Sequence, residues 1–209
     1  MRLLLIRHAE SEGNAQGRLQ GRKEYPLSER GITQAAALSE RLATLPIAAV
    51  YGSPIRRAFD TADTVGNRMG LPVVTEPRVQ EYDFGDKLSG LTWQEIRQLH
   101  PDVVSSLVSG GAEFPVYPGE EGRGAFRDRV TAAIAEIVER HAADEYVAVV
   151  THAGPVIVYL MEVLGRTYRR PIPFSIDNAS ITTIELASKP TPYQPPAVVT
   201  GINDTCHLS

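Results

Sequence analysis

The sequence predicts an α/β fold: one domain built as a three-layer sandwich, with a mostly parallel central sheet and helices on both faces. Three observations predict it. The chain has 209 residues, a length typical of a single domain. Short apolar runs alternate along it with stretches of helical period. Polar residues with useful chemistry follow directly after three of the apolar runs, where ligands bind in open parallel sheets.

The apolar runs are short enough to be buried strands rather than membrane spans. The predicted strands are residues 3–6, 48–51, 73–75, 147–151, 181–186 and 198–202. The predicted helices are residues 28–45, 54–70, 92–100, 126–141 and 156–164. Ser28 is a good N-cap, Ser53-Pro54 reads as a cap followed by proline at the first helical position, and Gly70 suits a helix end.

The remaining segments are predicted to be loops. Residues 7–26 are polar and glycine-dotted, and residues 189–196 form a proline-rich connection. Residues 109–124 are rich in glycine and proline and have no clear period. We therefore expect one domain over residues 1–209, with a lid insertion at about 82–124.

Composition excludes several classes of partner. Charged residues make up 22% of the chain and the formal net charge is −4, which gives no general attraction to nucleic acid or to an anionic membrane. The only cysteine is Cys206, so no internal disulfide can form, which suits a reducing cytosol. We expect a cytoplasmic protein that binds a small molecule at a local cluster of charge.

Such a cluster is predicted where three strands end. Arg7-His8 follows the first strand, a segment ending in Arg57 follows the second, and His152 follows the most apolar one. Arginine offers a fork of donors that suits phosphate oxygens, and histidine can act as a nucleophile. Nearby arginines lower the pKa of an imidazole, which keeps it neutral and nucleophilic.

These motifs resemble those of the histidine phosphatase superfamily, the phosphoglycerate-mutase-like enzymes, over nearly the whole chain. No single match is specific, but five in the same order and spacing are. The matching segments are Arg7-His8-Ala9-Glu10 with Asn14, Gln20-Gly21, Ser53-Pro54-Ile55-Arg56-Arg57-Ala58, Glu81 with Asp83-Phe84-Gly85, and Thr151-His152-Ala153-Gly154.

The resemblance implies a role for each matching residue. His8 would attack phosphorus and become phosphohistidine, and Glu81 would protonate the leaving alkoxide and later activate water. Arg7, Arg57 and His152 would hold the phosphoryl oxygens. The implied substrate-binding residues are Asn14, Gln20, Gly21 and Ala153. Neither a metal ion nor a cofactor is implied.

The resemblance implies a metal-independent phosphomonoesterase acting on a small phosphorylated metabolite. Two alternatives stay open: a phosphoglycerate mutase-type phosphoryl transfer, and an inactive phospho-ligand-binding or protein-interaction module. The segment after Glu81 is short and resembles the phosphatase branch, whereas mutases carry a longer insertion there. A homodimer is common among such folds, and the sequence leaves the oligomeric state open.

Other charged residues are expected to have ordinary roles. Arg57 is selected over its neighbour Arg56 because the family pattern places the arginine directly before alanine, so Arg56 is expected to be solvated or paired. Arg129 is expected to lie on a solvated helix face together with Arg127 and Arg140. His141 is expected to face water at the end of its helix. The C-terminal segment 203–209 is expected to lie near the site.

Overall fold

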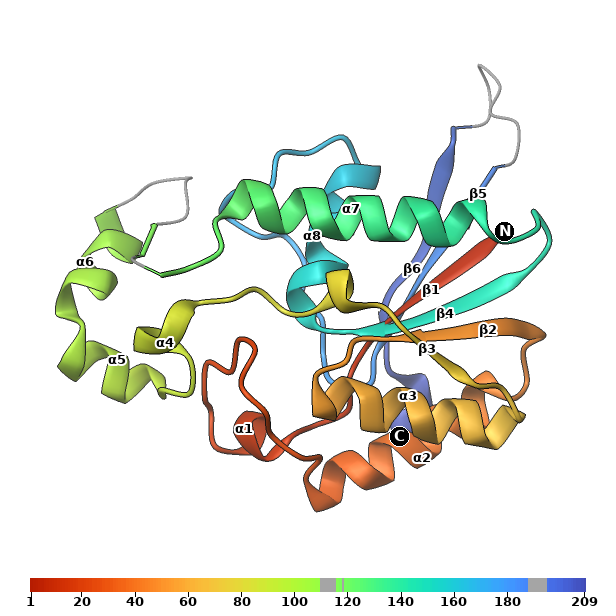
Figure 1. Cartoon of the computed structure of the whole chain (residues 1–209), viewed down its shortest axis with the longest axis horizontal. Coiled ribbons are helices and arrows are strands. Elements are labelled where there is room, and N and C mark those ends of the chain that lie inside the picture. Colours follow the sequence, from red (N-terminus) through yellow and green to blue (C-terminus); the bar gives the residue numbers. More distant parts are fainter. Residues whose placement is uncertain (110–115, 118, 188–194) are drawn as a thin grey trace.

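A computed structural model describes residues 1–109, 116–117, 119–187 and 195–209. Its centre is one six-stranded sheet with the order β3-β2-β4-β1-β5-β6 (Figure 1). The strands are β1 (Arg2–Arg7), β2 (Ile47–Gly52), β3 (Val73–Thr75), β4 (Tyr146–Thr151), β5 (Ile181–Leu186) and β6 (Ala197–Asp204). All six strands expected from the sequence are present within two residues of their expected bounds.

Four neighbouring strands of the sheet run parallel. β1, β2, β3 and β4 run parallel, while β5 pairs antiparallel with both β1 and β6. The prediction of an α/β fold with a mostly parallel sheet is confirmed. The register pairs Arg7 with Thr151 and Gly52 with Val150. The carboxyl ends of β2, β4 and β1 therefore meet at one edge.

Helices cover both faces of the sheet. On one face lie α2 (Glu29–Leu42) and α3 (Arg56–Met69), and on the other lie α7 (Arg123–Glu139) and α8 (Ala153–Val163) (Figure 1). The shorter helices are α1 (Glu12–Ala15), α4 (Gly85–Leu88), α5 (Trp93–Leu99), α6 (Pro101–Ser109) and the 3-10 turns η1 (Pro77–Val79) and η2 (Cys206–Leu208).

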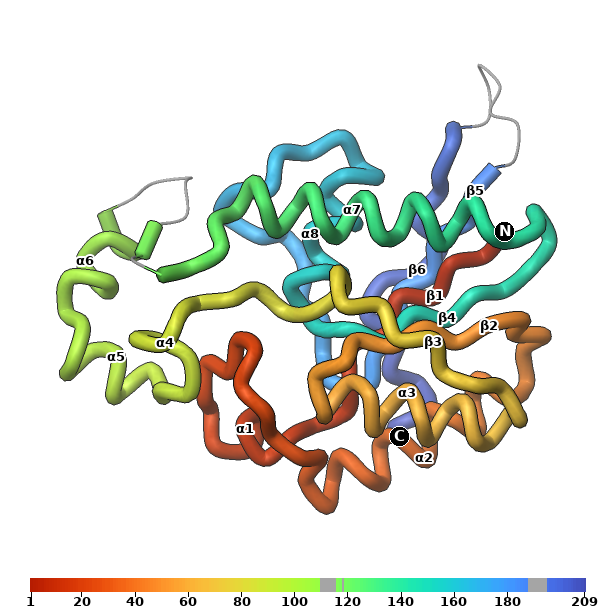
Figure 2. The backbone as a smooth tube through the Cα atoms, in the orientation of Figure 1, coloured from red at the N-terminus to blue at the C-terminus, as the bar shows by residue number. Residues whose placement is uncertain are grey.

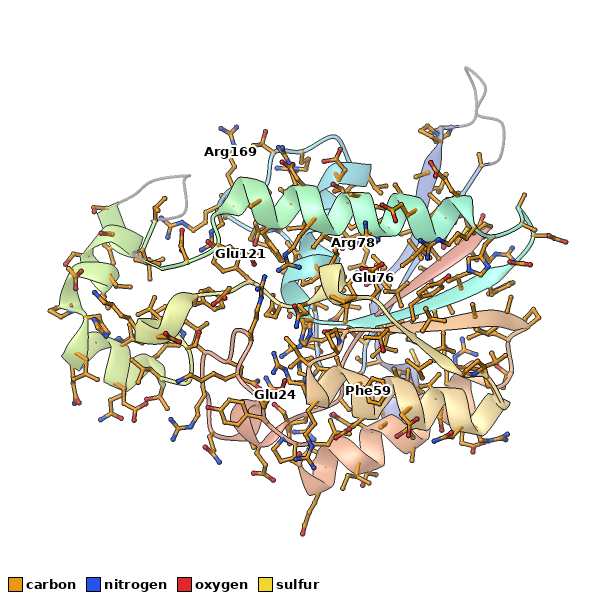
Figure 3. All side chains as sticks on the ribbon, viewed as in Figure 1. Glu24, Phe59, Glu76, Arg78, Glu121 and Arg169 are labelled. Atoms are coloured by element: carbon orange, nitrogen blue, oxygen red, sulfur yellow. The ribbon has the colours of Figure 1, made fainter. Side chains whose placement is uncertain are left out.

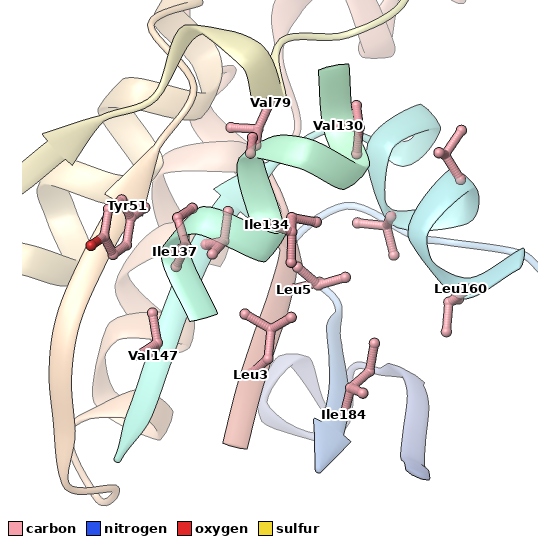
Figure 4. Close-up of a cluster of buried hydrophobic side chains, with 14 of the residues drawn as sticks. Leu3, Leu5, Tyr51, Val79, Val130, Ile134, Ile137, Val147, Leu160 and Ile184 are labelled. Atoms are coloured by element: carbon pink, nitrogen blue, oxygen red, sulfur yellow. The ribbon is translucent and has the colours of Figure 1, made fainter. Parts of the chain in front are cut away.

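The alternation of side chains along β1 explains why its four central residues are all apolar. Leu3 and Leu5 point into a core with Ile134 of α7 and Leu160 of α8 (Figure 4). The intervening leucine and isoleucine point into a second core against α2 and α3. A strand that is buried on both faces has no polar side, which is the pattern of a parallel sheet between helix layers.

The segment from α4 to α6 lies beyond the carboxyl ends of the central strands, apart from the sheet (Figure 2). It has a small core of its own, formed by Leu88, Ile96 and Val103. It belongs to the expected lid at 82–124, of which residues 110–115 and 118 lie outside the described residues. Most of the proline-rich connection at 189–196 also lies outside them.

The helices differ from expectation in several places, among them the starts of α2, α7 and α8, which lie one to three residues from the expected positions. α3 begins at Arg56, and its N-cap Ile55 makes no side-chain cap, so the prediction that Ser53-Pro54 opens this helix is wrong. Pro101 was expected to stop a helix, but it also starts α6, because proline is tolerated at a first helical position. The loop at 7–26 contains the one-turn helix α1, capped by Ser11.

None of the helices in the described part of the chain has the length and apolar character that a membrane span requires.

Candidate active site

His8 lies buried at the carboxyl end of β1, and its hydrogen bonds define its tautomer. Its Nδ1 lies 2.7 Å from the carbonyl oxygen of Ala9. A carbonyl can only accept, so Nδ1 carries the proton. The other nitrogen, Nε2, accepts a hydrogen bond of 3.1 Å from Nε of Arg57 and therefore carries the lone pair. This is the tautomer that a nucleophilic Nε2 requires.

Arg57 is one of the largest fully buried side chains, with 1% of its surface exposed. Besides its contact with His8, it donates to the carbonyl oxygens of Gly21 at 2.8 Å and Lys23 at 2.9 Å. Burial lowers the pKa of Arg57 to about 10, which still leaves it charged at neutral pH. Arg56 points to solvent and pairs with Asp60, as expected.

His152 follows β4 and is fully buried, with its ring centroid 5.1 Å from that of His8. Its Nε2 lies 2.9 Å from Oγ of Ser53, the serine that was expected to cap α3. Within the described residues its Nδ1 is buried without a hydrogen-bond partner, and so is Nε of Arg7. Two buried polar nitrogens next to the nucleophile are suited to an anion that brings acceptor oxygens.

Glu81 is held at the N-terminus of α8. One carboxylate oxygen accepts from its neighbour's amide, Tyr82 N, at 2.8 Å, and the other accepts from Gly154 N at 3.2 Å. A Cβ on Gly154 would lie 2.1 Å from Oε1 of Glu81. The Glu81 carboxylate therefore occupies the space that the missing side chain of Gly154 leaves.

The other expected site residues lie around this centre. Arg7 donates to the carbonyl oxygen of Ile176 at 2.6 Å and lines the same cleft. The side-chain oxygen of Asn14 accepts from Ser11 N, which leaves its NH2 as the donor it can offer. Gln20 and Gly21 also line the cleft, whereas Ala153, the first residue of α8, is not among its lining residues.

The cleft has a volume of about 230 Å³, and three of its lining residues come from the expected lid segment 82–124. It is lined by Arg7, His8, Asn14, Arg18, Leu19, Gln20, Gly21, Arg57, Glu81, Tyr82, Phe84, Arg123, Gly154 and Tyr168. Sequence reasoning missed Arg18, Arg123 and Tyr168, because no local pattern sets these residues apart. Arg123 lies 3.7 Å above the ring of Tyr82 and 3.9 Å from Glu120, with 19% of its side chain exposed.

Two expectations outside the cleft are wrong. Arg129 does not lie on a solvated face: its guanidinium binds Glu121 and three backbone carbonyls. His141 does not simply face water, because it contacts the Tyr51 hydroxyl at 3.0 Å and Glu145 at 2.7 Å. The C-terminal residues Thr205, Leu208 and Ser209 line a separate pocket that shares Arg7 with the cleft.

Both active-site histidines should make the fold sensitive to acid. Burial, and then the charge of Arg57, lowers the pKa of His8 and of His152 well below the ordinary 6.5. In the unfolded chain both would titrate near that ordinary value. Below about pH 6.5 the unfolded state therefore binds protons that the folded state does not, and stability falls with falling pH.

We expect the free energy of unfolding to be level between pH 7 and 8. From pH 6.5 to 5.5 it should decrease by up to about 1.4 kcal/mol per pH unit for each histidine. Urea titrations at several pH values measure this slope. His8→Asn should reduce the slope by up to about 1.4 kcal/mol per pH unit, the contribution of one histidine. A wild-type stability that stays level down to pH 5.5 would contradict the lowered pKa values.

Among the described residues, no three His, Cys, Asp or Glu side chains form a group that could hold a metal ion. The fold and the site together define a class: an α/β protein with a buried, neutral histidine among arginines, opposite a carboxylate. The profile of the Histidine phosphatase superfamily (branch 1) matches residues 3–192. The chain belongs to this superfamily.

Individual relatives agree. The chain is 32% identical to phosphoserine phosphatase 1 of Hydrogenobacter thermophilus, over 100% of this chain and 94% of the relative. It is 33% identical to the metal-independent phosphoserine phosphatase of Arabidopsis thaliana, over 99% and 83%. The solved structure of Bacillus stearothermophilus YhfR superposes with a TM-score of 0.87 at 28% identity, over 100% and 99% of the two chains. The prediction of a phosphoric monoester hydrolase is confirmed at the level of the family.

Proposed function

We propose that this chain hydrolyses a small phosphorylated metabolite without a metal ion, and that His8 carries the phosphoryl group between two half-reactions. The main observation in support is the position of Nε2 of His8. This nitrogen is unprotonated, buried and held beside Arg57 in a cleft that also contains Glu81. Arg7, Arg57 and His152 supply fixed donors for the phosphoryl oxygens, as phosphoryl transfer requires.

In the first half-reaction, Nε2 of His8 bonds to phosphorus as the ester P–O bond breaks, and Glu81 gives its proton to the departing oxygen. The Nδ1–H bond to Ala9 stabilises the positive charge that the imidazole gains. In the second, the Glu81 carboxylate takes a proton from water and the resulting hydroxide bonds to phosphorus. The P–N bond breaks, which releases inorganic phosphate and neutral His8.

The size and charge of the cleft support a small acidic substrate. Its 230 Å³ is below the range of pockets that hold drug-sized ligands. Arg18 and Arg123 add positive charge to the lining of the cleft, and Arg123 belongs to the lid segment 82–124 that we expect to contact the leaving group. Because two of the proteins named above are phosphoserine phosphatases, we propose a phospho-amino acid or phospho-hydroxy acid as the substrate.

The test is phosphate release from phosphoserine, 3-phosphoglycerate and p-nitrophenyl phosphate, each with and without EDTA. We expect release from phosphoserine that chelation leaves unchanged. Loss of activity with EDTA would overturn metal independence. Conversion of 3- to 2-phosphoglycerate without phosphate release would show a mutase. Absence of turnover on the whole panel would favour an inactive binding module.

Arg123→Gln should separate substrate recognition from chemistry. We expect KM for phosphoserine to rise roughly 10- to 100-fold, the equivalent of one lost charged hydrogen bond. The kcat/KM for p-nitrophenyl phosphate, which has no second anionic group, should change little. Arg127→Gln is the matched control on the same helix, since Arg127 is exposed, pairs with its neighbour Asp128 and is not among the residues that line the cleft. Equal losses on both substrates would contradict a recognition role.

A further inference from the structure

The peptide segment that carries Glu81 is held by an arginine that does not line the cleft. Arg129 of α7 donates from one nitrogen to the carbonyl oxygens of Arg78 at 2.6 Å and Gln80 at 2.8 Å. It donates from another nitrogen to the carbonyl oxygen of Glu81 itself at 3.0 Å. One planar guanidinium thus fixes three carbonyls within four residues.

Glu121 orients this guanidinium. Its two carboxylate oxygens accept from Nε and Nη2 of Arg129 at 2.8 and 2.7 Å, a bidentate pair in which both side chains are more than 80% buried. Burial alone would raise the pKa of Glu121, but hydrogen bonds from Arg129 and from the Asp83 amide hold this pKa below its ordinary value. The carboxylate is therefore charged at neutral pH.

Glu121 also holds the backbone on the C-terminal side of Glu81. Asp83 N donates to Glu121 at 2.9 Å, and the Glu121 amide donates back to the Asp83 carbonyl at 3.2 Å. Arg22, from the loop after α1, adds a further bond to Glu121 at 2.9 Å. Glu121 lies just before α7, close to the segment that leads on from Arg78 (Figure 3).

We propose that Arg129 and Glu121 are positioning residues that act on catalysis through Glu81. They hold the backbone on both sides of this residue, so that its carboxylate reaches the amides of Tyr82 and Gly154 and faces the cleft. A general acid must lie within hydrogen-bond reach of the leaving oxygen, and a displacement of about 1 Å can cost about 100-fold in rate. The proposal rests on the proposed function, since it assigns the position of the acid in that reaction.

The test uses the dependence of the rate on the leaving group. The kcat/KM value reports only steps up to departure of the leaving group. Phosphoserine has a poor alkoxide leaving group that needs a proton, whereas p-nitrophenolate departs without one. We expect Glu121→Gln and Arg129→Lys to lower kcat/KM for phosphoserine about 10- to 100-fold, and that for p-nitrophenyl phosphate less than about threefold.

Two controls isolate the pathway of the effect. Arg127→Lys, on the same helix but 51% exposed and remote from the segment, should leave both substrates unchanged. Adding Glu121→Gln to Glu81→Gln should cause no further loss on phosphoserine, because the acid is already absent. If Glu121→Gln does not fold, Arg22→Gln provides a milder test, because it removes the bond from Arg22 to Glu121. It should also lower kcat/KM for phosphoserine more than that for p-nitrophenyl phosphate, but by a smaller factor.

Equal losses on the two substrates, or lowered stability with unchanged kcat/KM, would overturn the positioning role. So would an additive loss in the double variant. These outcomes require a wild-type enzyme that hydrolyses both esters. A wild-type protein that hydrolyses neither would instead overturn the proposed function itself.

Discussion

His8→Ala is expected to reduce kcat on every phosphomonoester by at least about 10⁴-fold, since loss of a covalent nucleophile removes the whole two-step route. The arginines and His152 would still bind the phosphoryl group, so KM should change far less than kcat. Steady-state phosphate release from phosphoserine and from p-nitrophenyl phosphate measures both quantities.

The fold should tolerate this change. His8 is buried and neutral, and alanine leaves no charge unpaired, although Nε of Arg57 loses its acceptor. Circular dichroism should therefore match wild type. His141→Gln is the matched control, because His141 is bound to Tyr51 and does not line the cleft. It should keep wild-type kcat; a His8→Ala enzyme that retains a tenth of its activity would remove His8 as the nucleophile.

The second large effect is expected for Glu81→Gln. It should lower kcat/KM for phosphoserine by about 10²- to 10⁴-fold, the range attributed to general acid catalysis. For p-nitrophenyl phosphate the first half-reaction should stay fast. Water activation in the second half-reaction is lost, however, so stopped-flow should show a burst of about one nitrophenolate per active site followed by slow turnover. Equal loss in both phases, with no burst, would contradict the double role of Glu81.

Gly154→Ala offers an independent check on Glu81. The added Cβ would lie 2.1 Å from Oε1 of Glu81, and a flexible carboxylate gives way more readily than backbone. We therefore expect a folded protein with a displaced acid and a loss on phosphoserine of about 10- to 100-fold. Unchanged rates would mean that the observed contact between Gly154 and Glu81 is not needed for activity.

Much of the fold could be predicted because it is encoded locally. Each of the six strands contains a short run or a high share of apolar and β-branched residues, and Ser28 and Gly70 mark helix ends in the ordinary way. Ser53 does not cap α3, because the helix begins at Arg56 and the Ser53 hydroxyl accepts from the amide of Ile55, which precedes the helix, at 3.4 Å. The same hydroxyl lies 2.9 Å from Nε2 of His152, 99 residues away, a contact that exists only because the folded sheet brings β2 beside β4.

The site residues taken from the motifs lie in or beside one cleft, although neither His152 nor Ala153 is among its lining residues, but their supports could not be predicted. Arg127 and Arg129 look alike in the sequence, being two residues apart on one helix. One is exposed, while the other binds Glu121 and the carbonyls around Glu81, contacts that span about fifty residues of chain. Long-range pairing of this kind leaves no local periodicity.

Trapping the phosphoenzyme is the direct test of whether His8 carries the phosphoryl group. Glu81→Gln is mixed with ³²P-labelled p-nitrophenyl phosphate, whose leaving group needs no proton, then quenched within milliseconds and digested for mass spectrometry. We expect about one acid-labile, base-stable phosphate per chain, on the peptide that contains His8 and absent from His8→Ala. Phosphate on any other residue, or equal labelling of the His8→Ala protein, would contradict this role of His8.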